Sequence, residues 1–168
     1  MSIKESREST PRKWHYTVGA RFLSIVSDGM IKLATAGLPI DEKPIVWFST
    51  NPDWEQTANK LSLAYGKLIR LDRARTAELG GGLVRIGVAP ETAPHDWCAL
   101  KELSGMSGRV AQGLYRAAIE MGAHPGDWWG AFDAVSRSKW EVVQVYQDGT
   151  WIDIPLEHAL ERARGTNQ

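Results

Sequence analysis

Short runs of apolar residues, separated by turn-forming residues, make up the pattern of this chain. Aromatic and β-branched side chains alternate over residues 14–17, which predicts a strand that carries His15 and Thr17 on one face. Apolar residues then recur at helical spacing over 20–28, and Gly29 stands where a left-handed residue would end the helix. The same reasoning predicts further strands over 30–35, 45–50, 63–71, 83–88, 141–146 and 151–154.

Three further helices are predicted from their start and stop signals. Asn51 would cap a helix over 52–60, because proline at the first helical position loses no hydrogen bond. The longest helical pattern covers 109–121, stops at Gly122, and carries an apolar stripe that we expect to pack in the core. Pro155 begins a terminal helix in the same way as Pro52.

Turn residues divide these elements. Asp148-Gly149 predicts a hairpin turn between the last two strands, and residues 124–133 read as an aromatic loop. Tandem tryptophans in that loop, Trp128 and Trp129, either form a binding lip or pack across the core, and we expect core packing. The triple glycine at 80–82 lacks the Lys-Ser/Thr of a P-loop, so we interpret it as a turn.

Composition indicates one globular domain. Hydrophobic residues make up 43% of the 168 residues and charged residues 24%, which is close to the average of folded domains. Strands and short helices intermix without an internal repeat, so we expect a single α+β domain over 12–168. A polar arm over 1–11 precedes it, since that stretch offers little apolar surface to bury.

Charge and cysteine content limit the classes of partner that the chain is expected to bind and the compartment in which it is expected to occur. Lys plus Arg number 20 and Asp plus Glu also 20, so the chain has no overall positive field for nucleic acid or membranes. Cys98 is the single cysteine, which excludes an internal disulfide and favours a reducing compartment; we expect a cytoplasmic protein without a disulfide-linked partner. The four histidines are scattered, so no metal site and no membrane span are expected.

Three segments carry the candidate chemistry. Trp14-His15-Tyr16-Thr17 places a histidine and a threonine two residues apart on the first strand. Val46-Trp47-Phe48-Ser49 forms an aromatic strand, and Thr57-Ala58-Asn59-Lys60 follows after a loop. Glu141 begins the late strand Trp-Glu-Val-Val. In this order, the segments resemble the NAD-binding core of the ADP-ribosyltransferase superfamily, in its poly-ADP-ribose-polymerase and diphtheria-toxin branch.

The chain departs from that family at two positions. Tyr16 replaces the glycine of the His-Gly-Ser/Thr motif, a form that resembles smaller transferases which modify nucleic acid. Lys60 stands where the family has the tyrosine that stacks on nicotinamide. Trp47 or Tyr65 must therefore supply the stacking face if nicotinamide binds in the usual way.

The resemblance implies a fold, a reaction and a set of site residues. It implies a split, mostly antiparallel β core with short peripheral helices, and transfer of ADP-ribose from NAD to an unidentified protein, nucleic acid or small molecule. Glu141 is the implied catalytic residue. The implied NAD-binding residues are His15, Tyr16, Thr17, Trp47, Ser49, Thr57 and Tyr65.

These residue types suit the chemistry. Breaking the bond between nicotinamide and ribose develops positive charge on the sugar, which a carboxylate such as Glu141 stabilises. An imidazole at His15 and a hydroxyl at Thr17 would hold polar groups of the ribose, and Trp47 or Tyr16 would stack on a ring. Each also has a structural interpretation: Glu141 as a solvated edge charge, His15 as a core residue, and Ser49 as a local cap.

Other functions stay open at this point. A non-catalytic module of the same fold would bind a nucleotide or a partner. An RNA 2′-phosphotransferase would need several basic residues for its phosphate, and the loops between strands offer few. A Cys98–His95 nucleophilic pair is a weaker hypothesis, because no third group is in view to orient the histidine.

Overall fold

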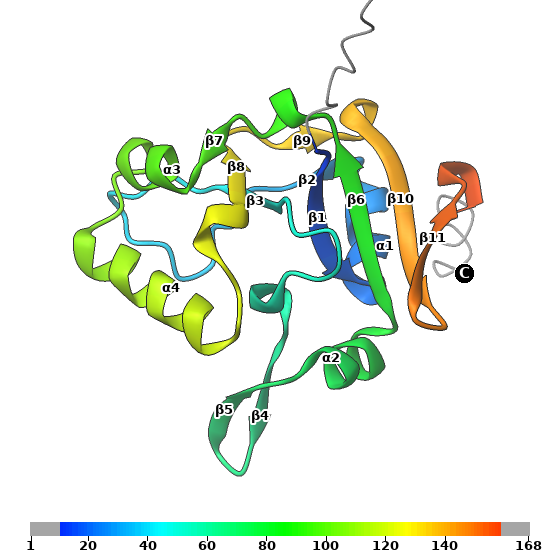
Figure 1. The fold of residues 1–168 in the computed structure, drawn as a ribbon, viewed down its shortest axis with the longest axis horizontal. Coiled ribbons are helices and arrows are strands. Elements are labelled where there is room, and N and C mark those ends of the chain that lie inside the picture. Colours follow the sequence, from blue (N-terminus) through cyan, green and yellow to red (C-terminus); the bar gives the residue numbers. More distant parts are fainter. Residues whose placement is uncertain (1–10, 159–168) are drawn as a thin grey trace, which may run out of the picture.

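The computed structural model describes residues 11–158; the predicted arm over 1–11, apart from its last residue, and most of the helix predicted after Pro155 lie outside them. Residues 156–158 are helical. The described chain is a mixed α+β structure with a mostly antiparallel sheet and short helices, as expected (Figure 1).

Seven strands form the main sheet, and every neighbouring pair in it is antiparallel. Their order is β11 (Thr150–Ile154), β10 (Trp140–Gln147), β6 (Leu83–Val88), β1 (Lys13–Val18), β3 (Val46–Ser49), β8 (Trp128–Ala131) and β7 (His95–Asp96). Two small antiparallel pairs lie outside it: β2 (Met30–Ile31) with β9 (Val135–Ser136), and β4 (Leu61–Ala64) with β5 (Lys67–Arg70).

The helices are short and surround the sheet. The α-helices are α1 (Gly19–Asp28), α2 (Arg73–Gly80), α3 (Trp97–Leu103) and α4 (Gly108–Glu120). Single 3₁₀ turns form η1 (Gln56–Ala58), η2 (Pro90–Thr92), η3 (Pro125–Asp127) and η4 (Arg137–Lys139). In Figure 1, α3 and α4 lie at the end of the sheet that holds β7 and β8, and the β4–β5 hairpin extends away from the body of the molecule.

The sheet opens between β1 and β3. Six residues of β1 pair with β6, whereas β1 and β3 share one register pair among the described residues, Trp14 with Ser49. Because the strands diverge beyond that pair, the edge of β1 from His15 onward faces a gap instead of a neighbouring strand. This opening positions the candidate site.

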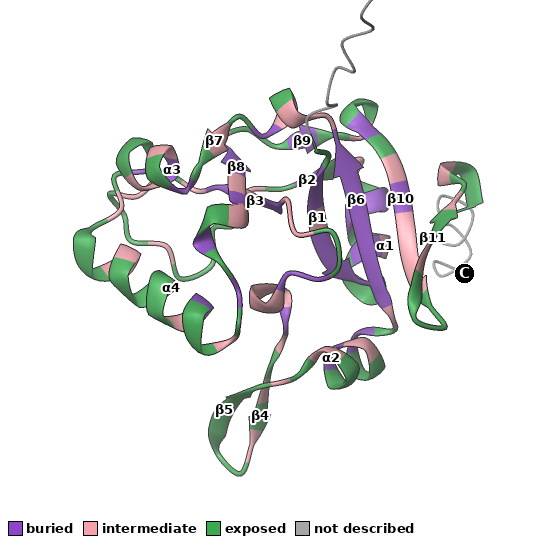
Figure 2. Cartoon of the chain, in the orientation of Figure 1, coloured by how far each residue is buried: buried purple, intermediate pink, exposed green. Residues whose placement is uncertain are grey.

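Alternation along β1 and β6 divides the core into two layers. One layer places Ile86, Val88 and Val143 against α1, with Phe22 and Val26 of that helix buried there. The other layer is built on the opposite side chains of β1. Its buried members are Trp14, Tyr16, Val18, Trp54 and Leu83. Figure 2 shows β1 and β6 buried along most of their length, while the β4–β5 hairpin is exposed or half-buried.

Several predicted elements are confirmed. The strands over 14–17, 45–50, 83–88, 141–146 and 151–154 and the helices over 20–28 and 109–121 are present within two residues of their expected bounds. Gly29 ends α1 in the left-handed conformation. The Asp148-Gly149 turn is also present, with both residues at positive φ.

The predicted helix over 52–60 is wrong. Asn51 does make the predicted cap contact, since its Oδ1 accepts from the amides of Asp53 and Trp54 at 2.9 and 3.3 Å. Glu55, however, has an extended backbone, and its buried carboxylate is held by side chains from elsewhere in the fold. Those contacts override the local helix signal, and only the single turn η1 follows.

Other corrections concern turns and exposure. The strand predicted over 63–71 is a hairpin, because Tyr65 and Gly66 both adopt positive φ and reverse the chain. The strand over 30–35 is limited to Met30–Ile31. The loop over 124–133 contains η3 and β8, and the sequence did not predict α2.

The apolar stripe predicted for the long helix is core only in part. Ala118 is fully buried, Val110, Ala117 and Met121 are half-buried, and Leu114 is exposed. Part of this stripe instead lines a pocket at the opening of the sheet.

Candidate functional site

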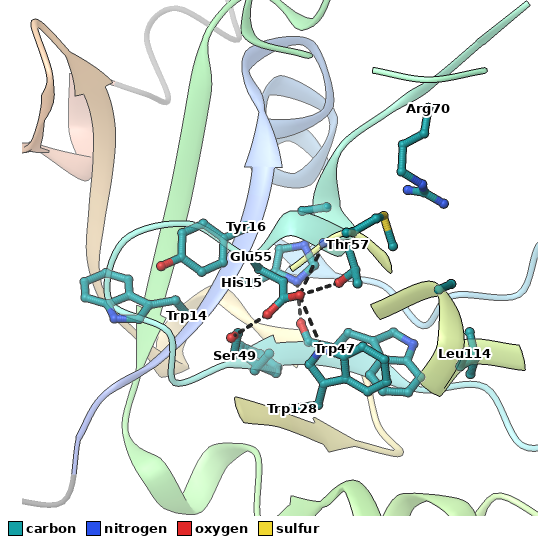
Figure 3. A pocket seen from close by; sticks show the side chains of 14 residues that line it. Trp14, His15, Tyr16, Trp47, Ser49, Glu55, Thr57, Arg70, Leu114 and Trp128 are labelled. Carbon is teal, nitrogen blue, oxygen red and sulfur yellow. Dashed lines mark hydrogen bonds between the residues drawn. The ribbon is translucent and has the colours of Figure 1, made fainter. Parts of the chain in front are cut away.

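A pocket of about 330 Å³ occupies the opening between β1 and β3 (Figure 3). Its walls come from β1, β3, η1, β8, the end of β5 and one side of α4. The residues that line it are Trp14, His15, Tyr16, Trp47, Phe48, Ser49, Glu55, Thr57, Ala58, Arg70, Leu114, Ala117, Met121 and Trp128. Ligand pockets of proteins begin at about this volume, and this one combines aromatic walls with a few polar groups.

The tautomer of His15 follows from its hydrogen bond. Its Nδ1 lies 2.8 Å from the backbone carbonyl oxygen of Trp47, across the gap that the diverging strands leave. A carbonyl oxygen only accepts, so Nδ1 carries the proton and Nε2 holds a free lone pair. Among the described residues no group donates to Nε2, which leaves it free to accept from a ligand.

His15 is neutral as well as oriented. Burial lowers the pKa of its imidazole below 6.5; the hydrogen bond to Trp47 raises the pKa in part, and the positive charge of Arg21 lowers it further. At neutral pH the imidazole is therefore uncharged. It is a fixed hydrogen-bond acceptor at the pocket wall.

Tyr16 is a fixed neutral phenol. Its hydroxyl donates to the carbonyl oxygen of Asn51 and accepts from Arg85 Nη1 at 3.2 Å. Burial raises the pKa of Tyr16 to about 12, against the opposing effect of Arg85. Its ring packs edge-on against Trp54, with centroids 5.2 Å apart. Both of these contacts hold the loop after β3 against β1.

Glu55 is the carboxylate of the pocket, and sequence reasoning missed it. Its Oε2 accepts from Ser49 Oγ at 2.8 Å, and its Oε1 accepts from Thr57 Oγ1 at 2.6 Å, from the Thr57 amide at 3.3 Å and from Trp128 Nε1 at 3.2 Å. Figure 3 shows these bonds converging on one side chain. A carboxylate offers about four acceptor positions, so Oε1 is filled and Oε2 keeps room for one donor.

Tryptophans form one wall. The rings of Trp47 and Trp128 lie edge to face, with centroids 5.9 Å apart, and Trp97 packs against Trp128 at 5.1 Å. Trp129 packs against the core layer that contains α1, and the ammonium of Lys13 lies 3.3 Å from its ring centroid. The tandem tryptophans thus serve two sites, and Trp128 both packs in a buried cluster, as expected, and lines the pocket.

The structure brings five of the predicted site residues together. His15, Tyr16, Trp47, Ser49 and Thr57 line the same pocket, although they come from separate segments of the chain. Ser49 and Thr57 both donate to Glu55, so their hydroxyl protons are already used.

Three predicted residues lie elsewhere. Thr17 lines a neighbouring hollow on the α1 side of β1. Tyr65 sits at the tip of the β4–β5 hairpin and is fully exposed. Glu141 stands at the start of β10, where its Oε2 accepts from Arg12 Nε at 3.0 Å. Arg12 in turn lies over the ring of Trp14, which lines the pocket.

The structure adds no hydrogen-bond partner, among the described residues, to the side chains of the Cys98–His95 candidate pair. Cys98 is exposed on α3, and the ring of His95 packs against Phe132 with centroids 5.3 Å apart. Across residues 11–158, no three His, Cys, Asp or Glu side chains gather in a way that suits a metal ion. Within the same residues, no helix has the length and apolar character needed to cross a membrane.

The fold and the pocket define the chain as an antiparallel α+β protein with an aromatic pocket at an opened strand pair. No family model, curated protein or solved structure matches it.

Proposed function

We propose that the pocket binds the nicotinamide-ribose half of NAD and that the protein transfers ADP-ribose to an acceptor. One observation carries this proposal: His15, Tyr16, Trp47, Ser49 and Thr57, which the resemblance to ADP-ribosyltransferases singled out, line a single pocket. The sequence separates the first and last of them by a helix, two strands and two loops. Only the opening between β1 and β3 unites them.

The contacts in the pocket suit that ligand. His15 Nε2 accepts a hydrogen bond from a ribose hydroxyl, and the rings of Trp47 and Trp128 offer an apolar wall for the flat nicotinamide ring. In the reaction, the bond between nicotinamide nitrogen and ribose C1′ breaks, and its electron pair leaves with nicotinamide. An acceptor nucleophile then forms a bond to C1′ and gives up its proton.

Glu141 is the proposed carboxylate that stabilises the cation-like sugar. Its side chain is 44% exposed and is paired with Arg12, which rests on the pocket residue Trp14. An exposed ion pair of this kind contributes about 1 kcal/mol or less, so the carboxylate is free to turn when a ligand enters. Glu55 is the competing carboxylate, because it already lies in the pocket.

Loss of the His15 acceptor tests binding. In His15→Ala, the affinity for NAD measured by calorimetry should fall roughly tenfold, since one hydrogen bond to the ligand is lost. His124→Ala is the matched control, because His124 is exposed outside the pocket. Equal affinity in His15→Ala and wild type would remove His15 from the site.

Two glutamate variants test the chemistry. Glu141→Gln should lower nicotinamide release from labelled NAD by roughly 10²-fold while NAD affinity changes little, because the charge acts mainly in the transition state. Its free energy of unfolding should change by no more than about 0.5 kcal/mol. Glu55→Gln should instead lower that free energy by about 1–2 kcal/mol, because a buried acceptor becomes a donor.

These outcomes separate the two carboxylates. Full activity in Glu141→Gln contradicts its catalytic role. A folded Glu55→Gln that binds NAD normally but releases no nicotinamide would transfer the role to Glu55.

A non-catalytic nucleotide-binding module is the second candidate. It is favoured by one observation: the pocket carboxylate, Glu55, is held by four hydrogen bonds among the described residues, and Glu141 lies outside the pocket wall. Such a module binds NAD in calorimetry, and nicotinamide release in its presence stays at the rate of the buffer.

A further inference from the structure

A second hollow of about 430 Å³ adjoins the aromatic pocket along the open edge of β1. His15, Tyr16 and Ala58 line both hollows, so the two meet at these residues. The second one extends past Thr17 toward α1, β2 and the loop that follows β2. The lining residues that matter here are Arg21, Ser24, Asp28, Lys32 and Lys60, with Met30 and Leu33.

The charges of the second hollow are mainly positive. Three cations line it, Arg21, Lys32 and Lys60, against one anion, Asp28. Asp28 is occupied, because its Oδ2 pairs with Lys32 Nζ at 2.8 Å. The side chains of Arg21 and Lys60 make no hydrogen bond or ion pair with any other residue of the range 11–158, so both charges remain available.

The cations lie next to the histidine of the aromatic pocket. Arg21 and His15 line the same hollow, and the positive charge of Arg21 contributes to the lowered pKa of the imidazole. Thr17 and Ser24 add hydroxyl donors to the same wall. Guanidinium, ammonium and hydroxyl groups around one hollow are the donors that phosphate groups take in proteins.

The two hollows therefore adjoin at shared residues and differ in chemistry. The aromatic pocket lies near the lower limit of volume for ligand sites and has one arginine, Arg70, in its lining. The second hollow offers cations and also the apolar side chains of Met30 and Leu33. A ligand that extends from one to the other carries a ring and a sugar at one end and phosphates further along.

We propose that the second hollow binds a nucleoside diphosphate, with its phosphates between Arg21 and Lys60 and its base against Met30 and Leu33. This inference deepens the proposed function and rests on it, because it assigns the ADP half of the dinucleotide to a specific set of residues. Lys60, which stands where the resembling family has a stacking tyrosine, then serves the phosphates instead of the ring.

The test measures binding of ADP, inorganic diphosphate and adenosine by calorimetry, which separates the phosphates from the nucleoside. Wild-type protein should bind ADP more tightly than either fragment, and the affinity should fall as salt is raised. Arg21→Gln and Lys60→Gln should each weaken ADP binding roughly tenfold, and the double variant further. Arg21→Lys should restore part of the affinity, because it keeps the charge.

Matched controls are Arg116→Gln and Lys139→Gln, which remove exposed cations that line neither hollow and should leave ADP affinity unchanged. Equal ADP affinity in wild type and the double variant would overturn the inference, as would a wild type that does not bind ADP. If inorganic diphosphate binds as tightly as ADP, the nucleoside contributes nothing to binding, and the assignment of the second hollow to a nucleoside diphosphate is overturned.

The outcomes also separate this inference from the proposed function. ADP binding that depends on Arg21 and Lys60, without any nicotinamide release, supports the second hollow and contradicts the transferase. If the wild type releases nicotinamide and the double variant binds NAD as tightly as the wild type, the transferase is supported and the second hollow is contradicted.

Discussion

His15 shows how a single residue acquires a defined chemical role from its surroundings. On a continuous sheet the backbone of His15 would pair with β3, but β1 and β3 diverge beyond Trp14. The imidazole lines the pocket and donates from Nδ1 to the Trp47 carbonyl oxygen, and no described residue donates to its Nε2. Both its tautomer and its neutral state follow from this position.

The lowered pKa of His15 predicts a pH dependence of stability. Its folded-state pKa lies below 6.5, so protonation favours the unfolded chain; this contribution to stability is complete above 6.5 and is lost as pH falls through the folded-state pKa. In His15→Gln the difference in melting temperature between about pH 7.5 and about pH 5.5 should therefore be smaller than in wild type. His124→Gln serves as control, and an unchanged difference in His15→Gln would contradict the burial of the imidazole.

The two glutamates show the limit of residue-level prediction. Glu141 resembles a catalytic position by its place at the start of a strand, yet it pairs with Arg12 outside the pocket. Glu55 has no signal in the sequence, because it falls in a stretch that reads as the first turns of a helix. Its partner Trp128 is 73 residues away, so only the folded chain brings the two together.

At the scale of elements, the β4–β5 hairpin behaves as an appendage. Leu63, Tyr65 and Leu68 are strongly exposed, and β5 is exposed along its whole length. Its turn is unusual, because Tyr65 adopts φ of 52° ahead of Gly66 at 74°. This conformation suits Asn-Gly better than Tyr-Gly, since asparagine tolerates positive φ.

Tyr65→Asn tests both the turn and the site assignment. The variant should raise the free energy of unfolding by about 0.5–1 kcal/mol, because it relieves the strained conformation of the turn. NAD affinity should stay unchanged, since the tyrosine is fully exposed at the tip. Urea denaturation and calorimetry check the two results, and a loss of NAD affinity would return Tyr65 to the binding site.

Helix α4 illustrates a pattern that was read correctly as a helix but only in part correctly as core. Its apolar stripe formed as expected, but Leu114, Ala117 and Met121 face the pocket, where they lie opposite β1 and β3. An apolar helix face therefore indicates that something apolar lies beside it, and here that neighbour is a pocket as well as the core.

At the scale of the whole molecule, close contact between layers depends on glycine. A Cβ added at Gly130 of β8 would lie 2.7 Å from Ile45 Cγ2 and 2.9 Å from Leu100 Cδ2, and 3.1 Å from the Val46 oxygen. Ile45 and Leu100 are both buried, so neither has space to move away. This contact joins β3, β8 and α3 behind the tryptophan wall of the pocket.

Gly130→Ala should therefore lower the free energy of unfolding by about 1–3 kcal/mol through overpacking. Gly113→Ala is the matched control: Gly113 lies in α4 with nothing within 4 Å of an added Cβ, so alanine there should raise stability by up to about 1 kcal/mol. Thermal melts of both variants check the prediction. Equal melting temperatures would show that β8 is less tightly held than its contacts indicate.

The sequence by itself determined the elements whose signals are local. The strands β1, β6, β10 and β11 and the helices α1 and α4 follow from alternation, helical spacing and glycine stops, which act within a few residues. The resemblance also named five residues that share one pocket. Neighbouring residues on one strand or at one turn constrain each other directly, so these elements need no information from the rest of the chain. That the five residues meet in one pocket was decided by the fold.

Tertiary structure alone decided the opening between β1 and β3, the fate of the 52–60 segment and the identity of the pocket carboxylate. In each case a distant group outweighs a local preference: Trp128 and Ser49 hold Glu55 in an extended conformation where the sequence favours a helix. A helix-capping signal contributes about 1 kcal/mol, whereas a buried carboxylate left without its donors costs more than that. The chain therefore follows the buried hydrogen bonds, and these exist only once the sheet has formed.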